Sequence, residues 1–227
     1  MAGKVNRKPV SPGATAALAF AFVLVLHLAW VGAWLLEQTL EARTNLLGTS
    51  GGRFGYWLGM KLLLWVLPAC IVIRLSGFTV RGRFNVERPR AVLAWGVGVG
   101  IILGVMALFA KTFSGQPVFS SSIGWPLFSG VVVAPFVEEL TFRGAVLGAL
   151  GRRFAFPAAN TLTALFFLGI HLPGWCFQGC LWDNLANLTG GALSIFLLGW
   201  VFGYVAHRSK SVAASTITHA LNNLFNA

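Results

Sequence analysis

Acidic residues are scarce in this sequence, which has 6 aspartates and glutamates against 17 lysines and arginines. Charged residues of both signs make up only 10% of the 227 residues, whereas hydrophobic residues make up 56%. A soluble fold of this size cannot bury so much apolar surface. The mean hydropathy of +0.75 agrees with this. The composition therefore predicts an integral membrane protein with several spans and argues against an ordinary soluble domain.

Cysteine is also rare, and three cysteines are too few for a disulfide framework. Cys70 lies in an apolar segment, where a buried and inert thiol is the usual state. Cys176 and Cys180 share a short loop. A local disulfide between them remains open if that loop faces an oxidising compartment.

The surplus of positive charge amounts to a formal net charge of +11. Such a charge can indicate a nucleic-acid partner, but the basic residues here form short clusters between hydrophobic segments. They do not form a stripe with interleaved aromatic residues. We therefore expect no nucleic-acid partner, and we interpret the charge as a consequence of membrane topology.

Apolar segments long enough to form membrane helices follow one another along the chain. The first is longer than the core of a signal peptide and has no clear cleavage site, so we expect it to be retained. We predict an all-α polytopic transmembrane helical bundle of about seven helices, with an eighth left open, forming a single integral membrane domain over residues 1–227. The seven segments cover residues 14–36, 56–73, 91–110, 125–150, 156–172, 190–206 and 211–225.

The distribution of basic residues tests this topology, because cytoplasmic loops carry an excess of lysine and arginine. Only Arg43, Arg53 and Lys111 lie in loops on one side of the predicted membrane. We therefore predict a cytoplasmic N-terminus, and seven spans would place the C-terminus outside. Twelve residues lie on the other side: Lys4, Arg7, Lys8, Arg74, Arg81, Arg83, Arg88, Arg90, Arg152, Arg153, Arg208 and Lys210.

The stretch V-A-P-F-V-E-E-L-T-F-R places Glu138, Glu139 and Arg143 inside an apolar run, where ionisable side chains are costly and usually functional. Glu139 and Arg143 are four residues apart and share a helix face, so they can form a buried structural pair. That pairing leaves Glu138 without a partner in its own helix. Pro135 can kink the helix and free backbone carbonyls beside a cavity. This arrangement favours Glu138 as a general base.

Two later segments also carry polar groups. His171 follows Phe167 by four residues in the fifth segment, and His219 precedes Asn223 by four residues in the seventh. A single intramembrane histidine is as easily a hydrogen-bonded core residue as a functional one. Polar groups from three helices of one small bundle favour a shared functional site.

Together these residues resemble the three motifs of an intramembrane endopeptidase family, the CPBP or ABI family, which includes CAAX prenyl proteases and bacteriocin-processing or self-immunity proteins. E-E-L-T-F-R matches E-E-x-x-x-R, F-L-G-I-H matches F-x-x-x-H, and H-A-L-N-N matches H-x-x-x-N. The resemblance covers about 125–227, which we take as the motif-bearing catalytic core. Family members often continue into another helix after the third motif, so the helix count and the side of the C-terminus stay open.

The resemblance implies a role for each matching residue. Glu138 would activate a water for attack on a peptide carbonyl, and His171 would position that water and move its proton. His219 and Asn223 would donate hydrogen bonds to the oxyanion. Supporting roles would fall to Glu139, Arg143 and Phe167, with the first two orienting Glu138.

The same histidines and glutamates can also be read as a zinc site, which needs three protein ligands and an open position. The sequence has no H-E-x-x-H motif, and an asparagine beside His219 suits an oxyanion donor better than a metal ligand. We therefore expect a glutamate-dependent mechanism with no cofactor, and we keep zinc as the alternative.

By resemblance, the substrate is a membrane-embedded or lipid-anchored peptide or protein, and the location is a prokaryotic plasma membrane. Two other classes of function remain open. One is a non-catalytic membrane scaffold or bacteriocin-immunity protein of the same fold. The other is a transporter, because intramembrane carboxylates and histidines also form proton relays, although no internal repeat is visible.

Overall fold

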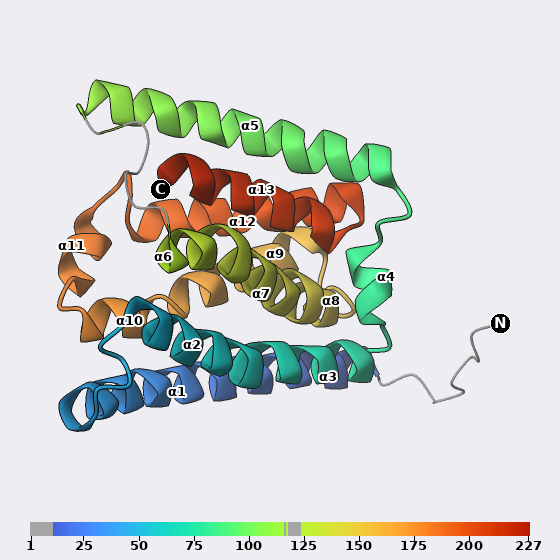
Figure 1. Ribbon diagram of the computed structural model, residues 1–227. Helices are drawn as coiled ribbons and strands as arrows, with labels where there is room; N and C mark the ends of the chain where they lie inside the picture. The colour runs from blue at the N-terminus through green and yellow to red at the C-terminus, as the bar shows by residue number, and fades with distance from the viewer. Residues whose placement is uncertain (1–10, 116, 118–123) are drawn as a thin grey trace.

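The structure is a computed structural model that describes residues 11–115, 117 and 124–227. The basic N-terminal residues Lys4, Arg7 and Lys8, which support the predicted orientation, lie outside the described residues. Throughout the described part of the chain, every regular element is helical (Figure 1). The prediction of an all-α transmembrane bundle is confirmed.

The first half of the chain forms two long antiparallel rods and a separate outer helix (Figure 1). The second rod is continuous from Ser50 to Leu75 and includes a π-helical segment at Leu62–Val66. Hydroxyl groups cap three of these helices, since Ser11 accepts from the backbone N–H of Ala14, Thr49 from that of Gly52 and Thr79 from that of Gly82. The helices are α1 (Pro12–Arg43), α2 (Ser50–Lys61), α3 (Leu67–Leu75), α4 (Val80–Phe84) and α5 (Pro89–Phe113).

The second half places one helical rod, residues 125–150, at the centre of the bundle (Figure 1). This rod has the limits predicted from sequence, and its residues from 137 to 150 are all buried. Two π-helical segments interrupt it, at Ser129–Val133 and Leu140–Val146. The α-helices are α6 (Trp125–Phe128), α7 (Ala134–Glu139), α8 (Leu147–Leu150), α9 (Phe156–Gly169), α10 (Leu172–Phe177), α11 (Leu181–Ala186), α12 (Ala192–Ser209) and α13 (Val212–Asn226).

Several features differ from the sequence expectation. The fifth span does not stop at Pro173, because α10 begins at Leu172 and proline fits the first turn of a helix, where its missing N–H costs no hydrogen bond. The short helices α4 and α11 were not expected. Cys70, Cys176 and Cys180 are all free, so the local disulfide left open by the sequence is not formed.

Within the described residues, four rods are long and apolar enough to cross a membrane. The remaining long segments, the central rod, α12 and α13, pack against one another or against α5 and α9. Such shielding by neighbouring protein allows polar residues at membrane depth. The total of seven spans stays a prediction. The four rods are Pro12–Arg43, Ser50–Leu75, Pro89–Phe113 and Phe156–Phe177.

Helix α13 is held in place by a row of glycines on α5. Gly96, Gly100 and Gly104 are buried at four-residue spacing and face α13. Small residues at this spacing let two membrane helices approach closely. Thr218 also donates a hydrogen bond to the carbonyl of Gly96 at 3.0 Å. This contact fixes the helix that carries His219.

Replacing one of these glycines should displace α13. A Cβ at Gly96 would lie 3.0 Å from the carbonyl oxygen of Ala214, which is backbone and cannot move aside. We expect Gly96→Leu to destabilise the fold by about 1–3 kcal/mol through overpacking. Gly98→Leu is the matched control, since nothing lies within 4 Å of a Cβ at Gly98. Thermal unfolding in detergent should show a lower midpoint for the first variant only, and equal midpoints would contradict the packing.

Candidate active site

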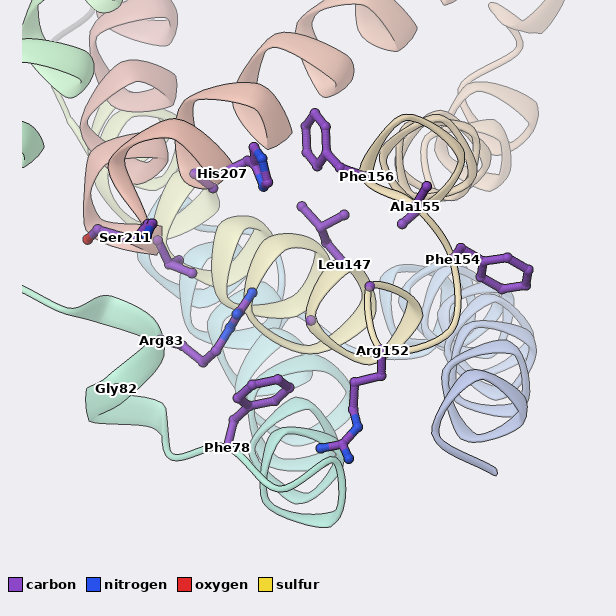
Figure 2. A pocket seen from close by; sticks show the side chains of 16 residues that line it. Phe78, Gly82, Arg83, Leu147, Arg152, Phe154, Ala155, Phe156, His207 and Ser211 are labelled. Atoms are coloured by element: carbon purple, nitrogen blue, oxygen red, sulfur yellow. The ribbon is translucent and has the colours of Figure 1, made fainter. Parts of the chain in front are cut away.

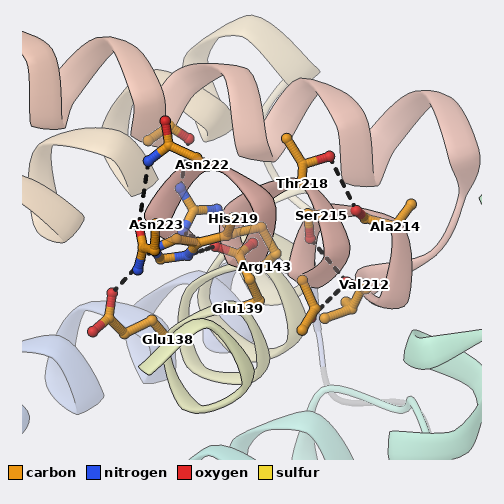
Figure 3. Close-up of polar contacts among 12 residues, drawn as sticks. Glu138, Glu139, Arg143, Val212, Ala214, Ser215, Thr218, His219, Asn222 and Asn223 are labelled. Atoms are coloured by element: carbon orange, nitrogen blue, oxygen red, sulfur yellow. Dashed lines mark hydrogen bonds and ion pairs between the residues drawn. The ribbon is translucent and has the colours of Figure 1, made fainter. Parts of the chain in front are cut away.

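The two glutamates leave the central rod in different directions (Figure 3). Glu139 is completely buried, whereas the side chain of Glu138 retains 12% exposure and lines a cavity. The π-helical segment that begins at Leu140 changes the register of the helix directly after this pair. Such π-helical turns are frequent at functional sites. The carboxylates therefore have different environments although they are neighbours in sequence.

Glu139 belongs to a structural ion pair, as its spacing from Arg143 predicts. Nη1 of Arg143 donates to Oε1 of Glu139 at 3.0 Å, and Nη2 of Arg143 donates to the carbonyl of Gly199 on α12 at 2.6 Å. Both side chains of the pair are fully buried. Removing one partner of such a pair leaves an uncompensated buried charge. The pair therefore ties the central rod to α12.

Phe167, expected only as a supporting residue, has a clear structural role. Its ring lies 4.5 Å below the guanidinium carbon of Arg143, and the ring of Phe202 lies 5.4 Å away from the same atom. Aromatic faces stabilise a desolvated guanidinium through cation–π interactions. The phenylalanine of the second motif thus supports the arginine of the first.

His219 reaches from α13 to both glutamates (Figure 3). Its Nδ1–H donates to Oε1 of Glu139 at 3.0 Å, and its Nε2 lies 3.9 Å from Oε2 of Glu138. The ring stacks on Phe202 with centroids 4.4 Å apart. Because Glu139 holds the Nδ1 hydrogen, Nε2 is the nitrogen that can exchange a proton beside Glu138.

Glu138 and His171 line the same cavity of about 190 Å³. His171 lies at the junction between α9 and α10. Nδ1 of His171 donates to the carbonyl of Phe167 at 2.7 Å. The Nε2 of a neutral His171 is therefore an acceptor. Tryptophans form much of the remaining wall: Trp30, Trp34, Trp65 and Trp175.

Lys61 is a residue of this site that the sequence motifs did not identify. Its Nζ lies 3.7 Å from Oε1 of Glu138, and its side chain is 13% exposed. It is the only charged residue in the predicted second span, residues 56–73. An intramembrane charge is costly and usually functional. Lys61 could therefore have been identified from the sequence on the same ground as Glu138.

Asn223, like His219, is not among the residues that line this cavity. Its side-chain amide donates to the carbonyl of Gly130 at 2.8 Å, and its carbonyl oxygen accepts from Nδ2 of Asn222 at 3.2 Å. Gly130 belongs to the π-helical segment that precedes α7. In this structure Asn223 connects α13 to the rod that carries Glu138.

The donor groups do not fit a zinc ion. Zinc needs three protein ligands close together, and no group of three or more His, Cys, Asp or Glu side chains in the described ranges is placed to hold a metal ion. The Oε1 atom of Glu139 already accepts from Arg143 and His219. No step that requires zinc is derived from this site.

Comparison with known proteins agrees with the motifs. Residues 120–225 match the family described as type II CAAX prenyl endopeptidase Rce1-like. A search of the curated proteins and a search of the solved structures each found no match. The matched range contains the central rod and the helices that carry His171 and His219. Over residues 120–225 the chain is therefore similar to the Rce1-like family of type II CAAX prenyl endopeptidases.

Proposed function

We propose that the chain is an intramembrane endopeptidase in which Glu138 activates a water molecule for attack on a peptide carbonyl. One observation carries this proposal: Glu138 lines the same cavity as His171 and lies beside Lys61, whereas Glu139 is committed to Arg143. A carboxylate with access to a cavity can accept a proton from water, which an ion-paired and fully buried carboxylate cannot do as readily.

The reaction begins with a water held between Glu138 and Nε2 of His171. Glu138 takes one proton as the water oxygen bonds to the carbonyl carbon of the substrate. The carbonyl oxygen takes up the π electrons and becomes an oxyanion. When the C–N bond breaks, the proton on Glu138 passes to the leaving nitrogen. The products are a carboxyl group and an amine, so atoms and charges balance. Lys61, whose Nζ lies 3.7 Å from Oε1 of Glu138, orients the carboxylate at the start of the cycle.

The oxyanion needs a hydrogen-bond donor near Glu138. His219 fits this role in its protonated form, because Nδ1 is held by Glu139 and Nε2 lies 3.9 Å from Glu138. Such a donor typically contributes on the order of a hundred- to a thousandfold in rate. Asn223 acts as a positioning residue, because its contact with Gly130 ties α13 to the central rod.

The proposed substrate is a membrane-embedded or lipid-anchored peptide that enters the site from the bilayer. The matched family is named for prenylated CAAX substrates, which belong to this class. We also propose a prokaryotic plasma membrane as the location and a cytoplasmic N-terminus, because the basic loops gather on one side of the predicted topology.

The test is peptide cleavage by the purified protein in liposomes. Three fluorogenic substrates distinguish the substrate classes: a prenylated CAAX peptide, the same peptide without its prenyl group, and a hydrophobic transmembrane peptide. We expect the wild type to cleave at least one and Glu138→Gln to cleave none at a comparable rate. Failure of the wild type on all three, with cellular function retained after Glu138→Ala and His219→Ala, would instead support a non-catalytic scaffold.

Replacing Lys61 should slow the reaction without unfolding the protein. Lys61→Met removes the cation from Glu138, and we expect kcat to fall about tenfold, which corresponds to about 1.4 kcal/mol of activation free energy. Lys61→Arg should recover part of the loss, because it restores the charge. Lys111→Met is the control, since Lys111 lies outside the cavity. Unchanged kcat in Lys61→Met would remove Lys61 from the mechanism.

A further inference from the structure

A second and larger cavity lies at the end of the bundle where most basic loops gather. It has a volume of about 530 Å³ and lies between the loop that carries α4, the end of α8, the start of α9 and the turn between α12 and α13 (Figure 2). Arg83, Arg152, His207 and Lys210 all line it, and none of its lining residues is acidic. Its chemistry therefore suits an anion.

The guanidinium of Arg83 points toward the central rod (Figure 2). Its Nη2 donates to the carbonyl of Arg143 at 2.6 Å, and the absence of a side chain at Gly148 lets the guanidinium lie against the central rod. A Cβ at Gly148 would lie only 3.2 Å from the guanidinium carbon. Burial lowers the pKa of Arg83 from its ordinary value. This group is thus a desolvated cation at the wall of the cavity.

The hydrogen bonding of Arg83 is incomplete. Its Nε is buried and has no hydrogen-bond partner within the part of the chain that the structure describes. A buried donor on a charged group is costly when it is left without an acceptor. Guanidinium groups match phosphate oxygens in geometry and charge.

The opposite wall of the cavity is apolar. Leu147, Phe154 and Phe156 line it, and the ring of His207 stacks on Phe156 with centroids 3.9 Å apart. A free inorganic anion gains no favourable contact from an apolar wall, whereas a phospholipid has hydrocarbon next to its phosphate. Basic pockets between membrane helices commonly hold anionic lipid headgroups.

We propose that this cavity binds a phosphate group, and that an anionic phospholipid supplies it with its glycerol and acyl chains against the apolar wall. Free phosphate is the other source of the same chemistry. The site is distinct from the cavity that contains Glu138, and its existence does not depend on the proposed protease activity. A bound phosphate would hold Arg83 against the backbone carbonyl of Arg143. The side chain of Arg143 in turn forms the ion pair with Glu139.

The test measures binding to the purified full-length chain in neutral detergent. Phosphatidylglycerol, phosphatidylcholine and inorganic phosphate are titrated separately, with thermal unfolding and native mass spectrometry as readouts. We expect saturable binding of phosphatidylglycerol, a higher unfolding midpoint and little response to phosphatidylcholine. A response to inorganic phosphate with equal affinity would support the phosphate site and overturn the lipid as its source.

Substitutions of single basic residues test whether phosphatidylglycerol binds in this cavity. Lys210→Gln and Arg152→Gln should each weaken phosphatidylglycerol binding about fivefold, as expected for one removed charge near a lipid headgroup. Arg153→Gln and Arg90→Gln remove the same charge from exposed residues that do not line the cavity, so they should leave the affinity unchanged. Arg83→Gln should abolish saturable binding. Equal losses in all variants would indicate diffuse attraction and overturn the site, as would no binding in the wild type.

Discussion

Glu138→Gln should lower kcat by about a hundred- to ten-thousandfold, the range typical of a lost general base. The substitution keeps the size of the side chain but removes its ability to accept the proton of water. The cavity and the contact of His219 with Glu139 do not depend on the charge of Glu138. We therefore expect an unchanged unfolding midpoint and a KM close to that of the wild type, measured with the liposome cleavage assay.

Glu139→Gln provides the comparison, because it makes the same chemical change at the adjacent residue. It leaves the buried Arg143 without its carboxylate, so the main loss should be of folded protein. Two results would contradict the assignment of roles. One is wild-type kcat in Glu138→Gln, and the other is a stable Glu139→Gln with the larger loss of kcat.

Arg143→Met should destabilise the protein by about 3–5 kcal/mol, the cost of breaking a buried ion pair from one side. The variant loses the bond to Glu139, the bond to the carbonyl of Gly199 and the cation–π contact with Phe167. It also leaves a buried carboxylate without compensation. Reversible unfolding in mixed micelles, with helicity as the readout, measures the change in the free energy of unfolding.

A double variant separates charge from packing. Combining Arg143→Met with Glu139→Leu removes both buried charges, and apolar replacement of a whole buried pair is often close to neutral in stability. We expect the double variant to regain part of the lost stability but not its activity, because His219 also loses the partner of its Nδ1. A double variant less stable than Arg143→Met would contradict the ion pair as the cause.

The limits of the central rod were predictable because its composition sets them. Residues 125–150 form an apolar run bounded by glycines at 124 and 151, and the structure gives the same limits. The end of the fifth span was not predictable in this way. Pro173 can either stop a helix or occupy its first turn, and tertiary contacts decide between the two. Gly174, for example, packs against Trp34 of α1.

Within the site, the pair of Glu139 and Arg143 was predictable because it is local to one helix. The positions of Glu138 and His171 relative to each other were not, since they depend on how two helices pack. Lys61 carried a usable signal, namely a lone charge in an apolar run, but it belongs to no motif. The contact of Asn223 with Gly130 had no signal in the sequence, because it depends on the rotation of α13.

The most direct test of glutamate-activated water is the origin of the oxygen in the new carboxyl group. The protein is transferred to water enriched in ¹⁸O and mixed with less substrate than enzyme, so that each active site acts once, and the products are analysed by mass spectrometry. We predict one ¹⁸O atom in the new carboxyl group after this single turnover and none in the Glu138 carboxylate. An unlabelled product, or ¹⁸O in Glu138, would show that the glutamate itself attacks the peptide and would contradict its role as a base.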